Sequence, residues 1–291
     1  MAFQVSLVLL AFAANSLLCR WALDVHQFDP AVFSLVRLLS GALTLTVLML
    51  LTRQRSAAAP APAMQSIKYR LQQKRFWLLG AGLGTYVLGF SWAYTQLDTG
   101  VGAFILFATV QLAMQVASFI QGGRLTRLQW SGVVISLLGL AGLLLPGGSA
   151  PAPLAAALMF IAALGWTAFV LMAKASGKAL EDVQQAFVAA SLLVIPLFPW
   201  LLDEWLHWSP MPWLLALLSG SVASGLGYFL WYRILPALGV HRAAQLQLLV
   251  PVIAVMMGVV ILAETLAVQA LFAMVVIIAG VMLSTFVKKR A

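Results

Sequence analysis

Ten apolar stretches, each about as long as a bilayer is thick, follow one another along this chain with short connections between them. A hydrocarbon core about 30 Å thick requires about 20 residues of helix to cross it. Of the 291 residues, 63% are hydrophobic and 9% are charged, whereas soluble domains carry charge on roughly a quarter of their residues. A water-soluble globule has no means of hiding this much apolar surface, so the chain is predicted to be an all-α integral membrane protein.

The charged residues lie mainly in the connections and alternate in sign along the chain. The predicted spans are residues 3–23, 31–52, 76–97, 101–121, 128–146, 154–173, 183–202, 213–235, 243–263 and 266–287. The even-numbered loops and the tail contain Arg53, Arg55, Lys68, Arg70, Lys74, Arg75, Arg124, Arg127, Lys174, Lys178, Arg242, Lys288, Lys289 and Arg290. The odd-numbered loops contain Asp24, Asp29, Asp98, Asp203, Glu204 and Glu264 instead.

This alternation predicts the orientation of the chain. Lys and Arg favour short cytoplasmic loops, so both termini are expected to be cytoplasmic. The excess of 17 Lys and Arg over 8 Asp and Glu is then a consequence of topology, and no nucleic-acid partner is expected. The location that follows is multi-pass in the inner (plasma) membrane of a bacterial cell.

The two halves of the chain resemble each other. Tyr94-Thr-Gln-Leu97 followed by Gly100-Val101 has a counterpart in Tyr232-Arg-Ile-Leu235 followed by Gly239-Val240. We therefore predict two repeats of five spans, residues 1–147 and 148–291, with a basic cytoplasmic linker at 53–75 in the first. Because five is odd, the second repeat enters the membrane inverted, an arrangement that favours alternating access to a midplane site.

The second half carries the motifs of a known family. They are the Leu-Trp-Tyr-Arg sequence that ends at Arg233, Pro251, Glu264-Thr-Leu and Gly280. This segment resembles the EamA repeat of the drug/metabolite transporter superfamily, and the first half resembles a diverged copy with Arg37 where the family commonly has arginine. Gln111 and Gly123 depart from the pattern. The resemblance implies ten spans and export of amino acids or related metabolites, with aromatic amino acid exporters of the YddG type as the nearest branch.

Polar and aromatic side chains recur at helical spacing inside several spans. Asn15 and Ser16 lie mid-span in the first span, and Trp166 occupies the matching place in the sixth. Aromatic faces with a few hydroxyls suit a zwitterion with an apolar or aromatic side chain, although buried polar groups also bridge packed helices. The predicted substrate-binding residues are Asn15, Ser16, Tyr86, Phe90, Tyr94, Phe107, Gln111, Gln115, Trp166, Ser224, Tyr228 and Gln247.

Five further residues are predicted to be structural or gating: Arg20, Asp24, Arg37, Pro251 and Glu264. An arginine within the hydrocarbon must be paired with another group or solvated by water. Arg20 reaches Asp24 one turn on. For Arg37 the sequence favours pairing with Asp29, Asp98 or Glu264 over binding a substrate carboxylate.

The sequence argues against an enzyme. Cys19 is the only cysteine, the three histidines lie in loops or at span ends, and no metal-ligand cluster or nucleophile motif occurs, so no cofactor and no metal are expected. The prediction is an exporter of small metabolites by alternating access, with a small-molecule substrate, the lipid bilayer as its surroundings, and a monomeric or weakly homo-oligomeric state. No Asp or Glu lies mid-span, which favours gradient-driven movement. The alternatives are a proton-coupled multidrug or cation exporter and a non-transporting assembly or sensor subunit.

Overall fold

The computed structural model describes residues 1–54, 71–122, 126–144, 151–196, 209–238 and 246–285. Throughout these residues the regular elements are helices, and none is a strand. In lipid every backbone polar group must be bonded within the protein, and a helix satisfies its own. The all-helical prediction is therefore confirmed for the described part of the chain.

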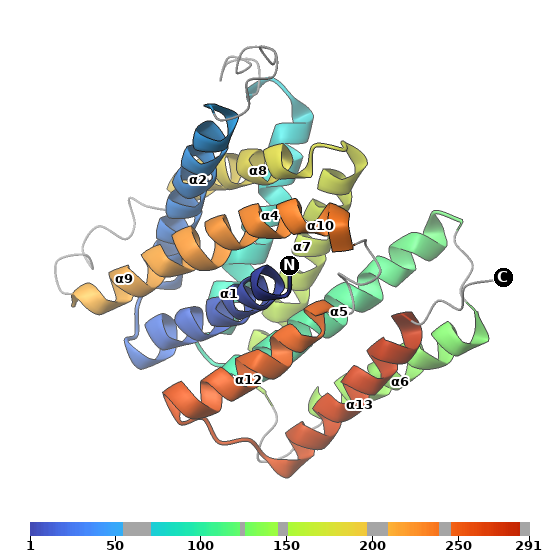
Figure 1. Ribbon diagram of the computed structural model, residues 1–291. Coiled ribbons are helices and arrows are strands. Elements are labelled where there is room, and N and C mark those ends of the chain that lie inside the picture. The colour runs from blue at the N-terminus through green and yellow to red at the C-terminus, as the bar shows by residue number, and fades with distance from the viewer. Residues whose placement is uncertain (55–70, 123–125, 145–150, 197–208, 239–245, 286–291) are drawn as a thin grey trace.

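The helices follow the predicted spans closely (Figure 1). They are α1 (Ala2–Arg20), which continues into the π-helical segment η1 (Trp21–Val25), α2 (Pro30–Gln54), α4 (Lys74–Ala93), α5 (Thr99–Ile120), α6 (Arg127–Leu144), α7 (Pro153–Ala175), α8 (Ala179–Val194), α9 (Pro210–Leu218), η3 (Ser219–Leu226), α10 (Gly227–Leu238), α12 (Leu249–Leu262) and α13 (Val268–Thr285). The segments α9, η3 and α10 join end to end into one rod. Most of the predicted linker 53–75 lies outside the described residues, which resume at 71.

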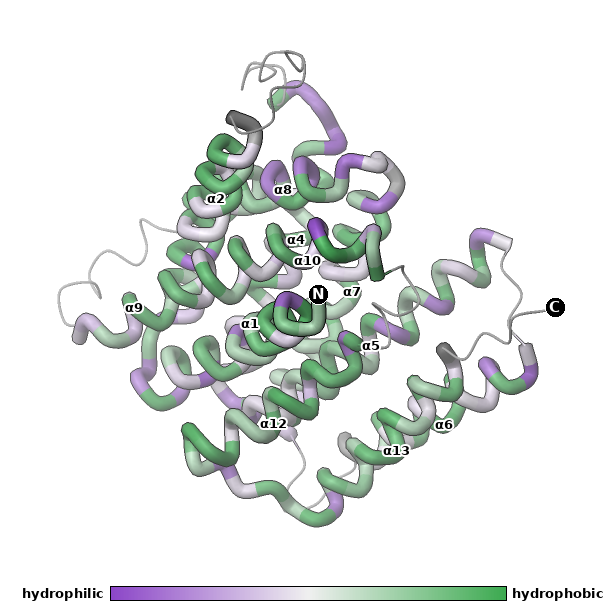
Figure 2. The backbone as a smooth tube through the Cα atoms, viewed as in Figure 1, coloured by the Kyte–Doolittle hydropathy of each residue, from purple (hydrophilic) through white to green (hydrophobic). Residues whose placement is uncertain are grey.

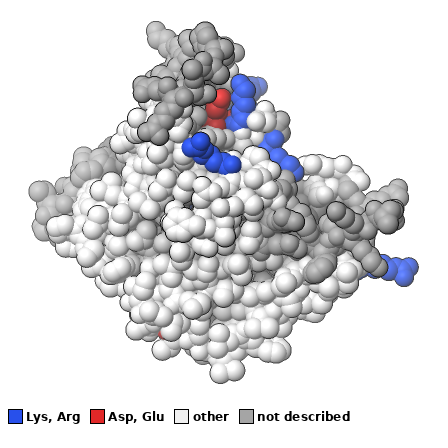
Figure 3. Space-filling model, in the orientation of Figure 1, with Lys and Arg blue, Asp and Glu red and all other residues white. Residues whose placement is uncertain are grey.

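Six of the described helical segments are long and apolar enough to cross a bilayer, and the helices Leu249–Leu262 and Val268–Ser284 are apolar but shorter. Their outer surface is apolar too. Val260 and Phe272 are 79% and 72% exposed, and Figure 2 shows hydrophobic residues along the outside of most helices. On the face drawn in Figure 3, Lys and Arg gather toward the upper end and the right-hand edge, and the broad middle has none. These features are those of a multi-pass membrane protein; the span count of ten and the inversion of the second half stay predictions.

Most of the core lies where α4 packs against α7 and α8, and where α2 packs against η3. Small residues make these contacts close. A side chain at Gly80 would meet Ala189 of α8, and one at Gly220 would meet the backbone of Arg37 in α2. Small residues let the backbones of membrane helices approach in this way.

An ion pair joins α4 to the first turn of α8. The Nη2 atom of Arg75 lies 2.7 Å from Oδ2 of Asp182 and 2.6 Å from the carbonyl oxygen of Met172. Asp182 also accepts a hydrogen bond from Ser176. The predicted basic loop before the third span and the loop after the sixth therefore lie at the same end of the bundle.

The helices α6 and α13 lie side by side at one edge of the molecule (Figure 1). Two glycines face each other across this contact. A Cβ atom at Gly132 would lie 2.6 Å from the carbonyl oxygen of Gly280 and would also overlap the backbone nitrogen of Ser284. Because the obstruction is backbone, no side-chain rotation can relieve it.

We expect Gly132→Ala to destabilise the protein by about 1–3 kcal/mol, the usual cost of overpacking. The added methyl group must push α6 away from α13. Gly142→Ala is the matched control, since a Cβ there has nothing within 4 Å and alanine favours the helix. Thermal unfolding in detergent measures both variants; an unchanged midpoint for Gly132→Ala would contradict the close contact.

Candidate functional site

A narrow cavity lies between the two halves of the bundle at mid-helix positions. Its walls come from α1, α2, α4, α5, α7, η3 and α10, with one further residue just before α12. The lining residues are Phe12, Asn15, Ser16, Arg37, Tyr86, Phe90, Leu106, Phe107, Val110, Trp166, Ala223, Ser224, Tyr228 and Gln247. The cavity has a volume of about 30 Å³, which is room for one or two water molecules.

Arg37 dominates the electrostatics of the cavity. Its side chain lies on α2 and is only 1% exposed. Its Nη2 donates to the hydroxyl of Tyr86 at 3.0 Å, and its Nε faces Oγ of Ser224 at 3.4 Å. Its Nη1 has no hydrogen-bond partner. A guanidinium presents five N–H donors and is always charged, so this group is mostly unsatisfied.

The aromatic rings beside Arg37 compensate its charge only in part. The guanidinium carbon lies 5.2 Å from the ring centre of Tyr86 and 5.0 Å from that of Phe90. Such cation–π contacts are worth about 0.5–2 kcal/mol each, whereas burying a charge without a counter-charge costs several kcal/mol. The cavity therefore retains a strong attraction for a negative group.

Hydrogen bonds between helices hold the polar side of the cavity in place. Ser219 of η3 donates to Oδ1 of Asn15 at 2.6 Å, and Nδ2 of Asn15 faces the hydroxyl of Tyr86 at 3.4 Å. On the other side, Nε1 of Trp166 donates to the hydroxyl of Tyr228 at 2.7 Å. These bonds join α1 to η3 and to α4, and they join α7 to α10.

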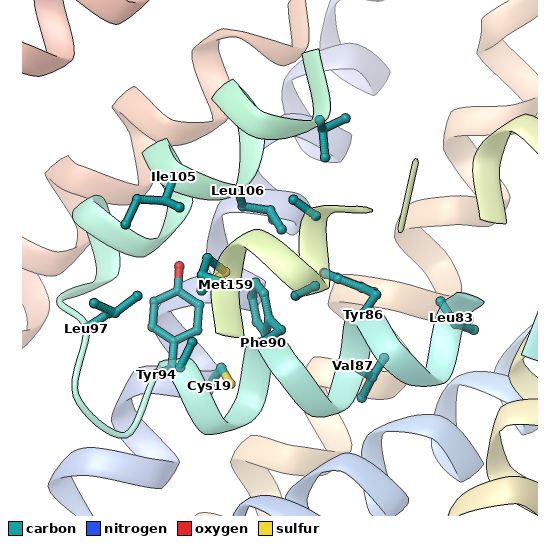
Figure 4. Packing of buried hydrophobic residues seen from close by; sticks show 14 of the residues in the cluster. Cys19, Leu83, Tyr86, Val87, Phe90, Tyr94, Leu97, Ile105, Leu106 and Met159 are labelled. Atoms are coloured by element: carbon teal, nitrogen blue, oxygen red, sulfur yellow. The ribbon is translucent and has the colours of Figure 1, made fainter. Parts of the chain in front are cut away.

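The rings of α4 form the apolar side. Figure 4 shows Tyr86, Phe90 and Tyr94 following one another along α4. The ring centres of Tyr86 and Phe90 are 5.3 Å apart, and those of Phe90 and Tyr94 are 4.6 Å apart. Edge-on and tilted contacts at such distances are favourable, so the three rings stabilise one another along α4.

The structure brings most of the predicted substrate-binding residues together. Those that line the cavity are Asn15, Ser16, Tyr86, Phe90, Phe107, Trp166, Ser224, Tyr228 and Gln247. Tyr94, Gln111 and Gln115 do not line it. Tyr94 is fully buried and donates to the carbonyl oxygen of Thr99, and Gln115 donates to Ser284 of α13 at 2.6 Å. For Gln115 the helix-bridging interpretation therefore fits better than a role in binding substrate.

Four apolar lining residues were missed from the sequence: Phe12, Leu106, Val110 and Ala223. Each is one apolar residue among many in an apolar span. No periodicity distinguishes a lipid-facing side chain from a cavity-facing one when both are hydrophobic. Only Phe12, which contacts Tyr228 at 5.6 Å between ring centres, is of a residue type that an aromatic site would suggest.

The favoured pairing of Arg37 with an acidic residue is wrong. Asp29 accepts hydrogen bonds from the backbone N–H groups of Ala31 and Val32, at the start of α2. The other two candidates, Asp98 and Glu264, both lie beside Arg20. The acids that the sequence offered are thus engaged at a helix end and at the neighbouring arginine, and Arg37 points into the cavity without them.

Arg20 holds several loops together at one end of the bundle. It lies 3.0 Å from Asp24, as predicted, and also 3.4 Å from Asp98 and 3.8 Å from Glu264. One of its nitrogens donates to the carbonyl oxygen of Tyr94 at 3.3 Å. The loops after the first, third and ninth predicted spans therefore meet at this end.

Glu264 caps the start of α5. Its carboxylate accepts from the backbone nitrogen of Thr99 at 2.9 and 3.0 Å and from the hydroxyl of Thr99 at 2.7 Å. Burial raises the pKa of Glu264 above its ordinary value, although the bonds from Thr99 and the charge of Arg20 oppose this shift. A carboxylate at a helix N-terminus is favourable, so Glu264 fastens the α12–α13 loop to α5. Pro251 is buried in the first turn of α12, where a missing N–H costs nothing.

The chemistry of the cavity is that of binding. The described residues of its lining supply hydroxyls, amides, aromatic rings and one guanidinium, and none of them supplies a carboxylate, imidazole or thiol. Within the described residues no group of three or more His, Cys, Asp or Glu is placed to hold a metal ion. The arrangement suits recognition of a small molecule that has an apolar body and a negative group.

Comparison with known proteins supports a transport role. Residues 153–286 match the EamA-like transporter family. An uncharacterised protein of Pseudomonas aeruginosa is 38% identical over 281 residues, covering 95% of this chain and 91% of that protein. A protein of Salmonella typhimurium named "probable amino-acid metabolite efflux pump" is 28% identical over 230 residues, covering 72% and 76%.

The fold also has a counterpart among solved structures. One crystal structure superposes with a TM-score of 0.63 at 18% sequence identity, and the alignment covers 96% of this chain and 98% of the other. At this identity the likeness concerns the fold alone. The sequence matches show that the chain is a membrane transporter and that it belongs to the EamA-like transporter family.

Proposed function

We propose that the protein exports amino acids or related small metabolites with apolar or aromatic side chains by alternating access at the central cavity. The observation that carries this proposal is the cavity itself, which both halves of the chain line at mid-helix positions. Its walls combine aromatic rings from α1, α4, α5, α7 and α10 with a few oriented polar groups. Small-molecule sites have this composition.

The helix contacts support two inverted five-span repeats. In such a plan α1, α2, α4, α5 and α6 correspond to α7, α8, the α9–η3–α10 rod, α12 and α13. By this correspondence, the packing of α4 on α7 and α8 is equivalent to the packing of the α9–η3–α10 rod on α1 and α2. Both sets of contacts occur. The same correspondence leaves the pairs α5 with α12 and α6 with α13 unchanged, and these helices are in contact as well.

The contacts at the two ends agree with the proposed orientation. Arg20, Asp98 and Glu264 join odd-numbered loops at one end, which the charge bias assigns to the extracytoplasmic side. Arg75 and Asp182 join even-numbered loops at the other. In this orientation both termini are cytoplasmic, and the chain lies in the inner membrane of a bacterium.

The cavity must enlarge for transport. Its present volume of about 30 Å³ is far below the roughly 300 Å³ of the smallest usual small-molecule sites. The extracytoplasmic side is held closed where α5 meets α12: a Cβ at Gly100 would overlap the side chain of Val255, and Glu264 bonds to Thr99 in the same region. Separation of α5 from α12 at this end would open the cavity outward.

The lining also bears on the energy source and the alternatives. Proton-coupled exporters usually carry a buried carboxylate that alternates between proton and substrate, and none of the described lining residues is a carboxylate. A cationic drug would meet the charge of Arg37. The proposal is therefore movement down the gradient of the substrate, without a cavity carboxylate. A non-transporting assembly or sensor subunit differs from this in showing no flux.

Purified protein in liposomes loaded with labelled phenylalanine, leucine, nucleobases or a cationic drug tests the proposal. We expect efflux of the aromatic and apolar amino acids above that of protein-free vesicles, with no stoichiometric change in luminal pH. Phe107→Ala should slow efflux of the aromatic substrate several-fold by removing part of the apolar wall, whereas Phe272→Ala on the lipid-exposed face of α13 serves as the control. Absence of flux for every solute would refute transport.

A second prediction concerns the closure at Glu264. In a Cys19→Ala background, which has no other cysteine, Ser224→Cys reports whether the cavity wall can be reached by a membrane-impermeant maleimide from outside intact cells. Adding Glu264→Ala removes the acceptor for Thr99, so we expect the labelling rate to rise several-fold. Glu181→Ala, which alters an exposed carboxylate at the other end of the bundle, should leave the rate unchanged.

The raised pKa of Glu264 sets the sign of the pH effect on this closure. A carboxyl whose pKa is higher in the closed state than in water binds its proton more tightly when closed, so closure is strengthened as pH falls through that pKa and weakened above it. Glu264→Gln, which keeps an oxygen acceptor without the charge, should therefore stay closed. A labelling rate for Glu264→Gln as high as that for Glu264→Ala would show that charge, and not the Thr99 bonds, holds the end shut.

A further inference from the structure

We infer that the transported species is a carboxylate in its net-anionic form and that Arg37 binds it directly. This inference rests on the proposed transport function and names the charge class of the substrate. The observation behind it is Arg37, a lining residue that is only 1% exposed and whose Nη1 atom has no hydrogen-bond partner among the described residues.

The guanidinium keeps unused donors for a planar acceptor. Nη2 is bonded to Tyr86 and Nε faces Ser224, both on the wall, whereas Nη1 is free. A carboxylate accepts two parallel N–H bonds from a guanidinium, and such paired bonds are strong and directional. The hydroxyl of Tyr86 is close enough to Arg37 to bond the same carboxylate, since hydroxyls both donate and accept.

Charge balance decides between an anion and a zwitterion. Among the residues that the structure describes, the cavity lining contains one full charge, that of Arg37, and no carboxylate. A monoanion brings the loaded cavity to zero net charge. A zwitterionic amino acid leaves one positive charge in the low-dielectric centre of the bundle, and a cation would leave two, which is increasingly unfavourable. The site is thus expected to bind an anion more tightly than a zwitterion, and a zwitterion more tightly than a cation.

The amine of a zwitterion would also lack an ionic partner. One amide oxygen of the lining, Oδ1 of Asn15, already accepts a hydrogen bond from Ser219. The carboxylates of Asp98 and Glu264 are held by Arg20 and Thr99, outside the lining. A substrate with a hydroxyl or carbonyl group in place of the ammonium needs no ionic partner there. Its aromatic body keeps the same contacts.

Anion transport would also explain how export proceeds without a cavity carboxylate. Each export step moves one net negative charge outward, and the inside-negative membrane potential favours that movement. At 100 mV the equilibrium ratio of a monovalent anion, outside to inside, is about 50-fold. The membrane potential itself then supplies the driving force.

Three near-isosteric probes test the inference: 3-phenyllactate, phenylalanine and phenylalaninamide, which carry net charges of −1, 0 and +1 at neutral pH. Binding to the purified protein is measured by tryptophan fluorescence, since Trp166 lines the cavity. We expect 3-phenyllactate to bind about tenfold more tightly than phenylalanine, because the ammonium of phenylalanine has no ionic partner in the lining, and phenylalaninamide to bind most weakly.

The variants separate binding from folding. Arg37→Lys keeps the charge without the forked donors and should reduce the preference for 3-phenyllactate, and Arg37→Gln should abolish it. Arg233→Gln removes an exposed arginine of α10 that lies outside the lining and should preserve it. Thermal unfolding of each variant shows that it is folded. A folded Arg37→Gln protein that still prefers 3-phenyllactate would overturn the inference.

A potassium diffusion potential across the liposome membrane tests the charge that moves. Inside-negative potential should accelerate efflux of 3-phenyllactate and inside-positive potential should slow it, whichever way the protein is inserted, and phenylalanine efflux should not respond. If phenylalanine or phenylalaninamide moves while 3-phenyllactate does not, the anion inference fails and transport stands. If no probe and no other solute moves, both fail.

Discussion

Lipid offers no hydrogen-bond partner, so each polar group within this bundle requires a partner from another part of the protein. The helices meet this requirement for the backbone. Side chains meet it by bonding across helices, as Ser219 does with Asn15 and Gln115 with Ser284. Among the described residues, Arg37 is the exception with the largest free-energy cost, because its charge is buried and its Nη1 has no hydrogen-bond partner.

This exception connects the architecture to the function. Close contacts through glycine, such as that of Gly220 against the backbone of Arg37, bring the rod α9–η3–α10 against α2 and place Ser224 beside the guanidinium. The same packing brings Tyr86 of α4 to the other side. The site is therefore a product of helices far apart in sequence, and movement of one half against the other would change its access while its polar groups stay on their own helices.

The two ends of the bundle differ in how they are held. Arg20 and Glu264 join three loops at one end through charge and through the hydrogen bonds of Thr99. At the other end Arg75 joins α4 to Asp182 in the first turn of α8. Water can solvate the charges of such ion pairs once the helix ends separate, which lowers the cost of breaking the pairs. That property suits a protein that opens at its ends.

Much of this was predictable from the sequence, because its causes are local. Hydrophobic length predicts where helices run, since 20 apolar residues match a bilayer, and the distribution of Lys and Arg predicts which loops share a side. Aromatic and polar residues at mid-span, such as Asn15, Tyr86 and Trp166, stood out against an apolar background, and the structure places these on the cavity wall. Asp24 lies one turn from Arg20, and that pair was predictable for the same reason.

Tertiary structure alone decided which of several equivalent partners meet. Arg37 had three acidic candidates by sequence, and the fold gave Asp98 and Glu264 to Arg20 and engaged Asp29 at the start of α2. Gln115 and Gln247 have the same side chain, yet one bridges to α13 and the other lines the cavity. A single chain with apolar spans throughout carries no local signal for which face of a helix meets lipid and which meets another helix, because both surroundings select the same hydrophobic residues.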